Sequence, residues 1–86
     1  MVRNIAKSSS KSNIRNNIRR LRFDTGEMTQ QALADKVGVS RQTIVAIEKG
    51  NYSPSLELAF RIAMEFNTPL EEVFIYEDPD KKIKES

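Results

Sequence analysis

The sequence predicts an all-α domain of five short helices, and three observations lead to this prediction. Apolar residues recur at spacings of three and four through most of the chain between Asn13 and Phe74. Ser or Thr precedes most of these periodic segments, and Gly follows the first three, which is typical of helix starts and ends. With 86 residues, of which 38% are hydrophobic, the chain suffices for one domain with a single modest core.

The first expected helix begins soon after Asn13 and ends at Gly26. Asn16 or Asn17 is its expected N-cap, because short polar side chains accept hydrogen bonds from the first free backbone N–H groups. Spacings of four and three place three apolar residues on one side of this helix. They are Ile14, Ile18 and Leu21.

The second and third expected helices are separated by only three residues, Gly38, Val39 and Ser40. Thr29 is the expected cap of the second helix and Ser40 of the third, whereas Gly38 and Gly50 end them. Inward positions are Ala32, Leu33 and Val37 on the second helix, and Ile44 and Ile47 on the third. So short a turn predicts two helices that cross closely.

The fourth expected helix starts at Ser55, and the fifth at Thr68 and Pro69. Thr68 and Glu71 have the spacing of a capping box, and Pro69 suits the first helical position. The fourth helix carries Leu56, Ala59, Ile62, Ala63 and Phe66, and the fifth runs through Leu70, Val73 and Phe74.

The two ends of this helical region are candidates for a small terminal β-ribbon. Ile75, Tyr76 and Glu77 have strand-like character. If residues 12–15 are extended, the two segments could pair as an antiparallel ribbon, which is marginal unless it packs on the helices.

Charge and composition divide the chain into three expected parts: a flexible basic leader over residues 1–12, a folded domain over 13–76 and a charged tail over 77–86. Residues 1–22 carry seven bases and no acid, whereas the remaining residues carry seven bases and twelve acids. The N-terminal part therefore attracts polyanions. Two readings of the leader stay open, a solvated segment and an arm that lies along phosphates or in a minor groove.

Composition argues against several classes of protein. The absence of Cys and His excludes disulfides, thiolate or imidazole metal sites and the usual nucleophile and general-base pairs. No signal peptide or membrane-length apolar stretch is present, so a cytoplasmic protein with no membrane partner is expected. No cofactor, metal, enzymatic activity or small-molecule ligand is expected. The acidic residues near the C-terminal end lack metal-loop spacing and are read as a solvated face; they are Glu71, Glu72, Glu77 and Asp78.

The outward side of the third expected helix has the chemistry of base recognition. Arg41 can donate two hydrogen bonds to guanine, Gln42 can pair with adenine, and Val45 can contact a thymine methyl group. Acids are missing from this helix until Glu48. Its outward positions are Arg41, Gln42, Val45, Ala46 and Lys49. Such a helix is suited to a major groove.

The stretch from Gln30 to Gly50 carries Leu33, Ala34, Gly38, Val39, Ser40, Ile44, Ile47 and Glu48 without insertion. In this pattern the chain resembles the Cro/C1-type (XRE-like) helix-turn-helix family of repressors, over about Ile18 to Phe74. It is most similar there to short stand-alone regulators like the cytolysin operon repressor, which share Ser40 to Ile44, Tyr52, Pro54 to Leu56 and Asn67 to Leu70. This kinship implies a five-helix lambda-repressor-like domain, a homodimer and a terminal β-ribbon. The turn from Thr25 to Met28 looks one residue longer than usual, and the leader is an addition.

The resemblance also implies roles for individual residues. Arg41, Gln42, Val45 and Ala46 would face bases, whereas Gln30, Ser40, Thr43, Lys49, Asn51 and Tyr52 would line phosphates. Arg22 and Glu48 would form a structural ion pair. For Tyr52, packing under the loop is an equal alternative. Phe74, Ile75 and Tyr76 either complete the core or form a dimer interface, and the interface is favoured for at least one of them.

The predicted function is sequence-specific binding of double-stranded DNA by a transcriptional regulator, with a repressor expected. A symmetric homodimer would place two copies of the third helix on an inverted-repeat operator. Two alternatives stay open. In one, the chain is the antitoxin of a toxin pair and residues 76–86 fold around a partner; in the other, it controls a restriction-modification system.

Overall fold

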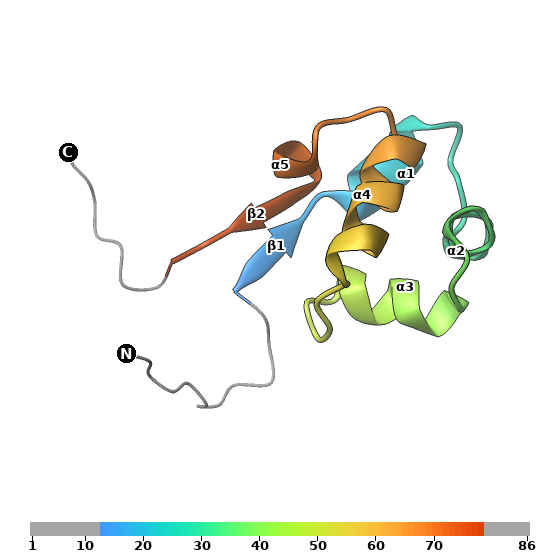
Figure 1. Cartoon of the computed structure of the whole chain (residues 1–86). Coiled ribbons are helices and arrows are strands. Elements are labelled where there is room, and N and C mark those ends of the chain that lie inside the picture. The colour runs from blue at the N-terminus through green and yellow to red at the C-terminus, as the bar shows by residue number, and fades with distance from the viewer. Residues whose placement is uncertain (1–12, 79–86) are drawn as a thin grey trace.

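The computed structural model describes residues 13–78, which form five helices and a two-stranded ribbon (Figure 1). The predicted all-α domain with a terminal ribbon is confirmed. The predicted leader lies outside the described residues, as does the predicted tail beyond Asp78. In chain order the elements are β1 (Ile14–Asn16), α1 (Ile18–Asp24), α2 (Gln30–Val37), α3 (Arg41–Glu48), α4 (Leu56–Glu65), α5 (Leu70–Val73) and β2 (Phe74–Tyr76).

Three helices begin at the hydroxyl caps that the sequence predicts. The side chains of Thr29, Ser40 and Ser55 accept hydrogen bonds from backbone N–H groups three residues on, at 2.9, 3.2 and 3.1 Å respectively. Each bond satisfies a donor that the first turn of a helix leaves free. The boundaries of α2, α3 and α4 therefore follow from local sequence.

The predicted capping box of the fifth helix is wrong. Pro69 is the N-cap of α5, and its carbonyl accepts from the N–H groups of Glu72 and Val73. The Thr68 hydroxyl instead donates to the carbonyl of Phe66 at 2.9 Å. The Thr68 side chain is thus directed at the end of α4, and α5 has no side-chain cap.

Two apolar residues that were expected on helices lie in strands. Ile14 belongs to β1 and not to the first helix, and Phe74 belongs to β2 and not to the fifth. Asn17 occupies the N-cap of α1 but makes no side-chain cap hydrogen bond. Its amide nitrogen donates to the carbonyl of Glu72 at 2.9 Å. Long-range contacts thus override the helical spacing at both ends.

The ribbon joins the two ends of the described chain. Its strands are antiparallel and pair Ile14 with Tyr76, Arg15 with Ile75 and Asn16 with Phe74. The first strand lies slightly later than the expected residues 12–15. The side chain of Asn16 donates to the carbonyl of Ile47 at 2.9 Å, which ties the ribbon to the end of α3. This packing on a helix supplies the support that a two-stranded ribbon needs.

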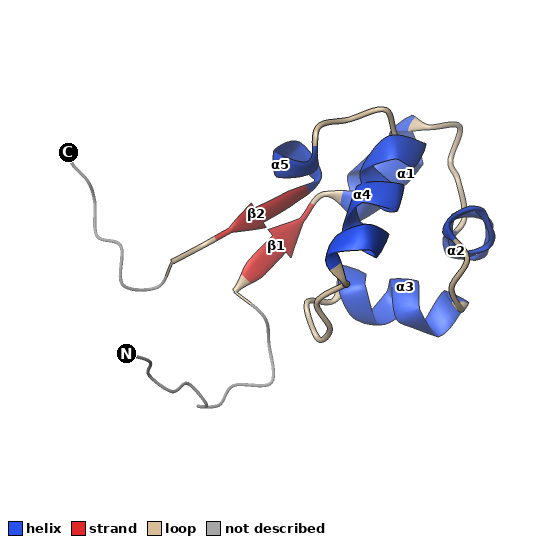
Figure 2. Cartoon of the chain, viewed as in Figure 1, coloured by secondary structure: helices blue, strands red, loops and turns tan. Residues whose placement is uncertain are grey.

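Every helix contributes residues to one core. Figure 2 shows the five helices in blue and the two strands of the ribbon in red. Six large side chains are fully buried: Ile18, Leu33, Ile44, Ile47, Ile62 and Val73. Phe74 is partly buried and packs against this core. Within residues 13–78, no helix is long and apolar enough to cross a membrane.

Candidate nucleic-acid interface

The turn between α2 and α3 holds these helices in the arrangement of a helix-turn-helix. Gly38 has a φ of 81°, a left-handed conformation that glycine adopts at no steric cost. The N–H groups of Gly38 and Val39 both donate to the carbonyl of Ala34, at 2.8 and 3.0 Å. Ala34 is fully buried, and its small side chain lets the two helices approach. The third helix consequently lies along one edge of the molecule (Figure 1).

The two sides of α3 differ sharply in burial and chemistry. Ile44 and Ile47 anchor the inner side in the core. On the outer side, Arg41, Gln42 and Lys49 are exposed, and Val45 and Ala46 are partly buried. The residues predicted to read bases therefore share one outward side, which is the placement that a groove-binding helix requires. Their contacts with bases stay predictions.

The residues predicted to bind phosphate surround the two ends of α3. The hydroxyl groups of Ser40 and Thr43 lie 3.0 Å apart at its beginning. At its end, Lys49 is exposed and Asn51 and Tyr52 follow in the loop. Tyr52 is 50% exposed and is not part of the core cluster, and its phosphate contact stays a prediction.

Glu48 is the one acid of α3, and two neighbouring helices bind its carboxylate. Arg22 donates from Nε and Nη2 to the two carboxylate oxygens, at 2.7 and 3.1 Å. The amide of Gln30 donates to one of these oxygens at 3.2 Å. The Arg22 and Glu48 side chains are only 14% and 9% exposed. This ion pair neutralises the charge of Glu48, and the free charges of the outer side, Arg41 and Lys49, are positive.

The same network changes the expectation for Gln30. Its amide nitrogen carries two hydrogens, and one of them is already directed at Glu48. The other hydrogen is available for a phosphate oxygen. Gln30 therefore connects the start of α2 with the end of α3, and its predicted phosphate contact stays a prediction.

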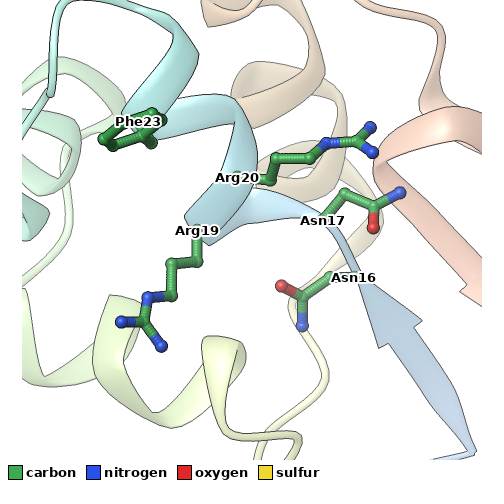
Figure 3. A pocket seen from close by; sticks show the side chains of 5 residues that line it. All are labelled: Asn16, Asn17, Arg19, Arg20 and Phe23. Atoms are coloured by element: carbon green, nitrogen blue, oxygen red, sulfur yellow. The ribbon is translucent and has the colours of Figure 1, made fainter.

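Arg19 is a candidate that the sequence reading did not single out. It lies three residues before Arg22, and this spacing places both on the same side of α1, near α3. Figure 3 shows its side chain directed toward α3, whereas that of Arg20 points away. Both arginines line a shallow surface pocket with Asn16, Asn17 and Phe23. The i, i+3 spacing from Arg22 was the available signal.

The three residues expected at a dimer interface are not equally accessible. Phe74 packs against the core and Ile75 is partly buried, whereas 64% of Tyr76 is exposed. No cluster of three or more potential metal ligands occurs among residues 13–78.

Comparison with known proteins agrees with this geometry. The helix-turn-helix family pattern matches residues 13–73. A protein of Methanocaldococcus jannaschii, described as an uncharacterized HTH-type transcriptional regulator, is 62% identical over 53 residues, covering 62% of this chain and 80% of that protein. The cryptic phage CTXphi transcriptional repressor of Vibrio cholerae is 36% identical over 56 residues, covering 65% of this chain and 50% of the repressor.

A solved structure extends the likeness to the fold. The solution structure of the SOS-response transcriptional repressor LexA from Eubacterium rectale has a TM-score of 0.60 and 27% identity, covering 81% of this chain and 71% of that one. Helix-turn-helix proteins bind double-stranded DNA, and the family is not one of enzymes. The chain belongs to the helix-turn-helix family of DNA-binding transcriptional regulators and is of the Cro/C1 type.

Proposed function

We propose that this protein binds an inverted-repeat operator as a homodimer and represses transcription sterically. The observation that supports this proposal most directly is the outer side of α3, where Arg41, Gln42 and Lys49 are exposed and the only acid of the helix is paired with Arg22. A helix with this side enters a major groove without repelling phosphates. Repression is supported by the similarity to a phage repressor.

Base discrimination is assigned to the first half of α3. Arg41 and Gln42 are exposed in its first turn, and side chains near the start of a recognition helix contact base edges. Val45 lies one turn after Arg41 and adds an apolar contact that suits a thymine methyl group. Ala46 is small and allows the helix to approach the floor of the groove.

Affinity is assigned to the groups that flank this helix. Ser40 and Thr43 at its start, together with Lys49, Asn51 and Tyr52 at its end, would hold the two phosphate backbones of one groove. Arg19 adds a positive charge from α1 on the side that faces α3. Such contacts fix the register and carry little sequence information.

Two copies are needed because one α3 reads a short site. An eight-residue helix is about 12 Å long, so it covers only a few base pairs. A two-fold dimer would place two such helices in successive major grooves, with centres about 34 to 36 Å apart. The operator would then be an inverted repeat.

Substitutions of Arg41 test this function. Arg41→Ala should cost about 1 to 3 kcal/mol on a selected duplex and relax the base preference at one position of each half-site. Arg41→Lys is the matched control, since it keeps the charge but loses the bidentate geometry. It should retain affinity for random duplex and lose discrimination. Titrations on selected and random duplexes measure both effects, and an equal loss on the two would exclude base reading by Arg41.

A further inference from the structure

The outer side of α4 is apolar and uncovered. Leu56, Phe60 and Met64 follow one another at four-residue spacing, so they lie in one row along the helix. Their exposed fractions are 68%, 48% and 77%. We call these three side chains the α4 row. Exposed apolar residues that are contiguous in this way mark interaction surfaces, whereas single ones need no explanation.

The charged residues of α4 lie off this row and are already paired. Arg61 donates to the carbonyl of Val37 at 3.4 Å and to the carboxylate of Glu57 at 3.1 Å. Glu65 pairs with Lys36 of α2 at 3.7 Å. These contacts direct Arg61 and Glu65 toward α2. The row itself is therefore uncharged along its whole length.

We infer that the α4 row is the dimer interface, and that each of its side chains packs near the same residue of a second copy. This inference rests on the proposed function, which requires a two-fold dimer. On a two-fold axis a residue meets its own copy, so a charged residue there would face a like charge. An uncharged row flanked by charges that are satisfied within the monomer meets this electrostatic requirement of self-pairing.

The position of α4 relative to α3 sets the direction of the two-fold axis. Seven residues separate the end of α3 from the beginning of α4, and Figure 1 shows α4 rising away from the edge where α3 lies. Leu56 is consequently near α3, and Met64 is at the far end. An axis that runs along α4 leaves both copies of α3 at one end of the dimer, where a single duplex can reach them. The two α4 helices then run side by side in the same direction.

The size of the row determines the strength of the dimer. The row spans about 12 Å of helix, since each residue rises about 1.5 Å. This patch is much smaller than a standard interface of about 1,600 Å² in total. The dimer is therefore weak in solution, and the duplex tightens it by holding two copies next to each other.

Substitutions at Met64 test the interface, because this side chain is the most exposed of the row and can be changed without disturbing the core. Met64→Glu and Met64→Lys should each abolish the weak self-association that the wild type shows in sedimentation equilibrium at high protein concentration, and should lower the affinity for a selected inverted repeat by about a hundredfold. Affinity for a single half-site should not change. Phe23→Glu is the control: Phe23 is 66% exposed on α1, outside the row, and its substitution should leave the dimer intact.

Mixing the two variants tests self-pairing itself. If position 64 meets its own copy, an equal mixture of Met64→Glu and Met64→Lys should recover dimers on the selected duplex, because opposite charges then face each other. Dimerisation of either single variant at the wild-type strength would overturn the inference, and so would a mixture that binds the selected duplex no better than the single variants. If the wild-type protein did not bind a half-site at all, the proposed function itself would be contradicted. Failure of the interface and failure of the proposed function therefore give different results.

Discussion

Glu48 shows how a single residue serves both the fold and the proposed interface. Its carboxylate receives hydrogen bonds from Arg22 and Gln30, so three helices meet at one side chain. The same contacts prevent an acidic charge on α3 from repelling DNA. An acid is tolerated on the recognition helix because it faces inward and is paired.

Removal of this charge should destabilise the protein. Glu48→Gln leaves the Arg22 guanidinium largely buried without a counter-charge and should cost about 3 kcal/mol, the lower end for broken buried pairs. Glu57→Gln is the matched control, because the Glu57–Arg61 pair is exposed and is worth about 0.3 to 0.5 kcal/mol. Chemical denaturation gives both values. Similar losses of unfolding free energy for the two variants would show that the Arg22–Glu48 pair stabilises the protein no more than an exposed pair does.

Arg19 and Arg20 offer a second test at this scale. They are consecutive, exposed and equally charged, but only Arg19 points toward α3 (Figure 3). Arg19→Ala should weaken binding to every duplex and reduce the slope of log affinity against log salt by about 0.9, the value for one lost phosphate contact. Arg20→Ala should leave the slope unchanged. Equal effects of the two substitutions would assign both to long-range charge attraction.

The outward side of α3 could be predicted from sequence, whereas the only sequence signal that separates Arg19 from Arg20 is its i, i+3 spacing from Arg22. Arg41, Gln42 and Lys49 are identified by helical spacing alone, because Ile44 and Ile47 fix which side of α3 is inward. Arg19 depends on the position of α1 relative to α3, which is set by Asn16 and Arg22 through contacts with residues 26 to 31 positions away.

At the scale of the elements, the turn between α2 and α3 is the most constrained feature. Gly38→Ala should cost about 1 to 2 kcal/mol, because an L-residue in the left-handed region is strained. A Cβ atom there would lie 3.5 Å from Nη1 of Arg61, which is ordinary contact, so the cost comes from the backbone. Asp35→Ala, at an exposed site in α2, is the control and should change stability by less than about 0.5 kcal/mol. Thermal unfolding compares them, and an unchanged melting temperature for Gly38→Ala would contradict the account.

Element boundaries were predictable where the partners of a cap are local. Thr29, Ser40 and Ser55 bond N–H groups three residues on, so the sequence contains the whole interaction. Thr68 and Asn17 are also residue types that cap helices. However, Thr68 donates to the carbonyl of Phe66 at the end of α4, and Asn17 donates to the carbonyl of Glu72 in α5. Their partners depend on the fold, and local rules therefore misassigned the start of α5 and the course of the chain at Ile14.

At the scale of the whole molecule, the ribbon closes the domain and supports the recognition helix. It pairs residues 58 to 62 positions apart, and Asn16 connects it to the last turn of α3. The core then holds α3 from inside through Ile44 and Ile47. The domain thus positions α3 as a rigid element, which reduces the ordering cost of binding.

We propose that α3, held by the core and doubled by a two-fold axis, reads DNA sequence. Selection of bound duplexes from a random library at moderate salt tests it most directly. We expect an inverted repeat whose half-site centres are separated by about one turn of B-DNA, 10 to 10.5 base pairs, with guanine preferred at the position that Arg41 contacts. A protein that enriches no sequence, and binds the selected and scrambled duplexes equally, would contradict the claim.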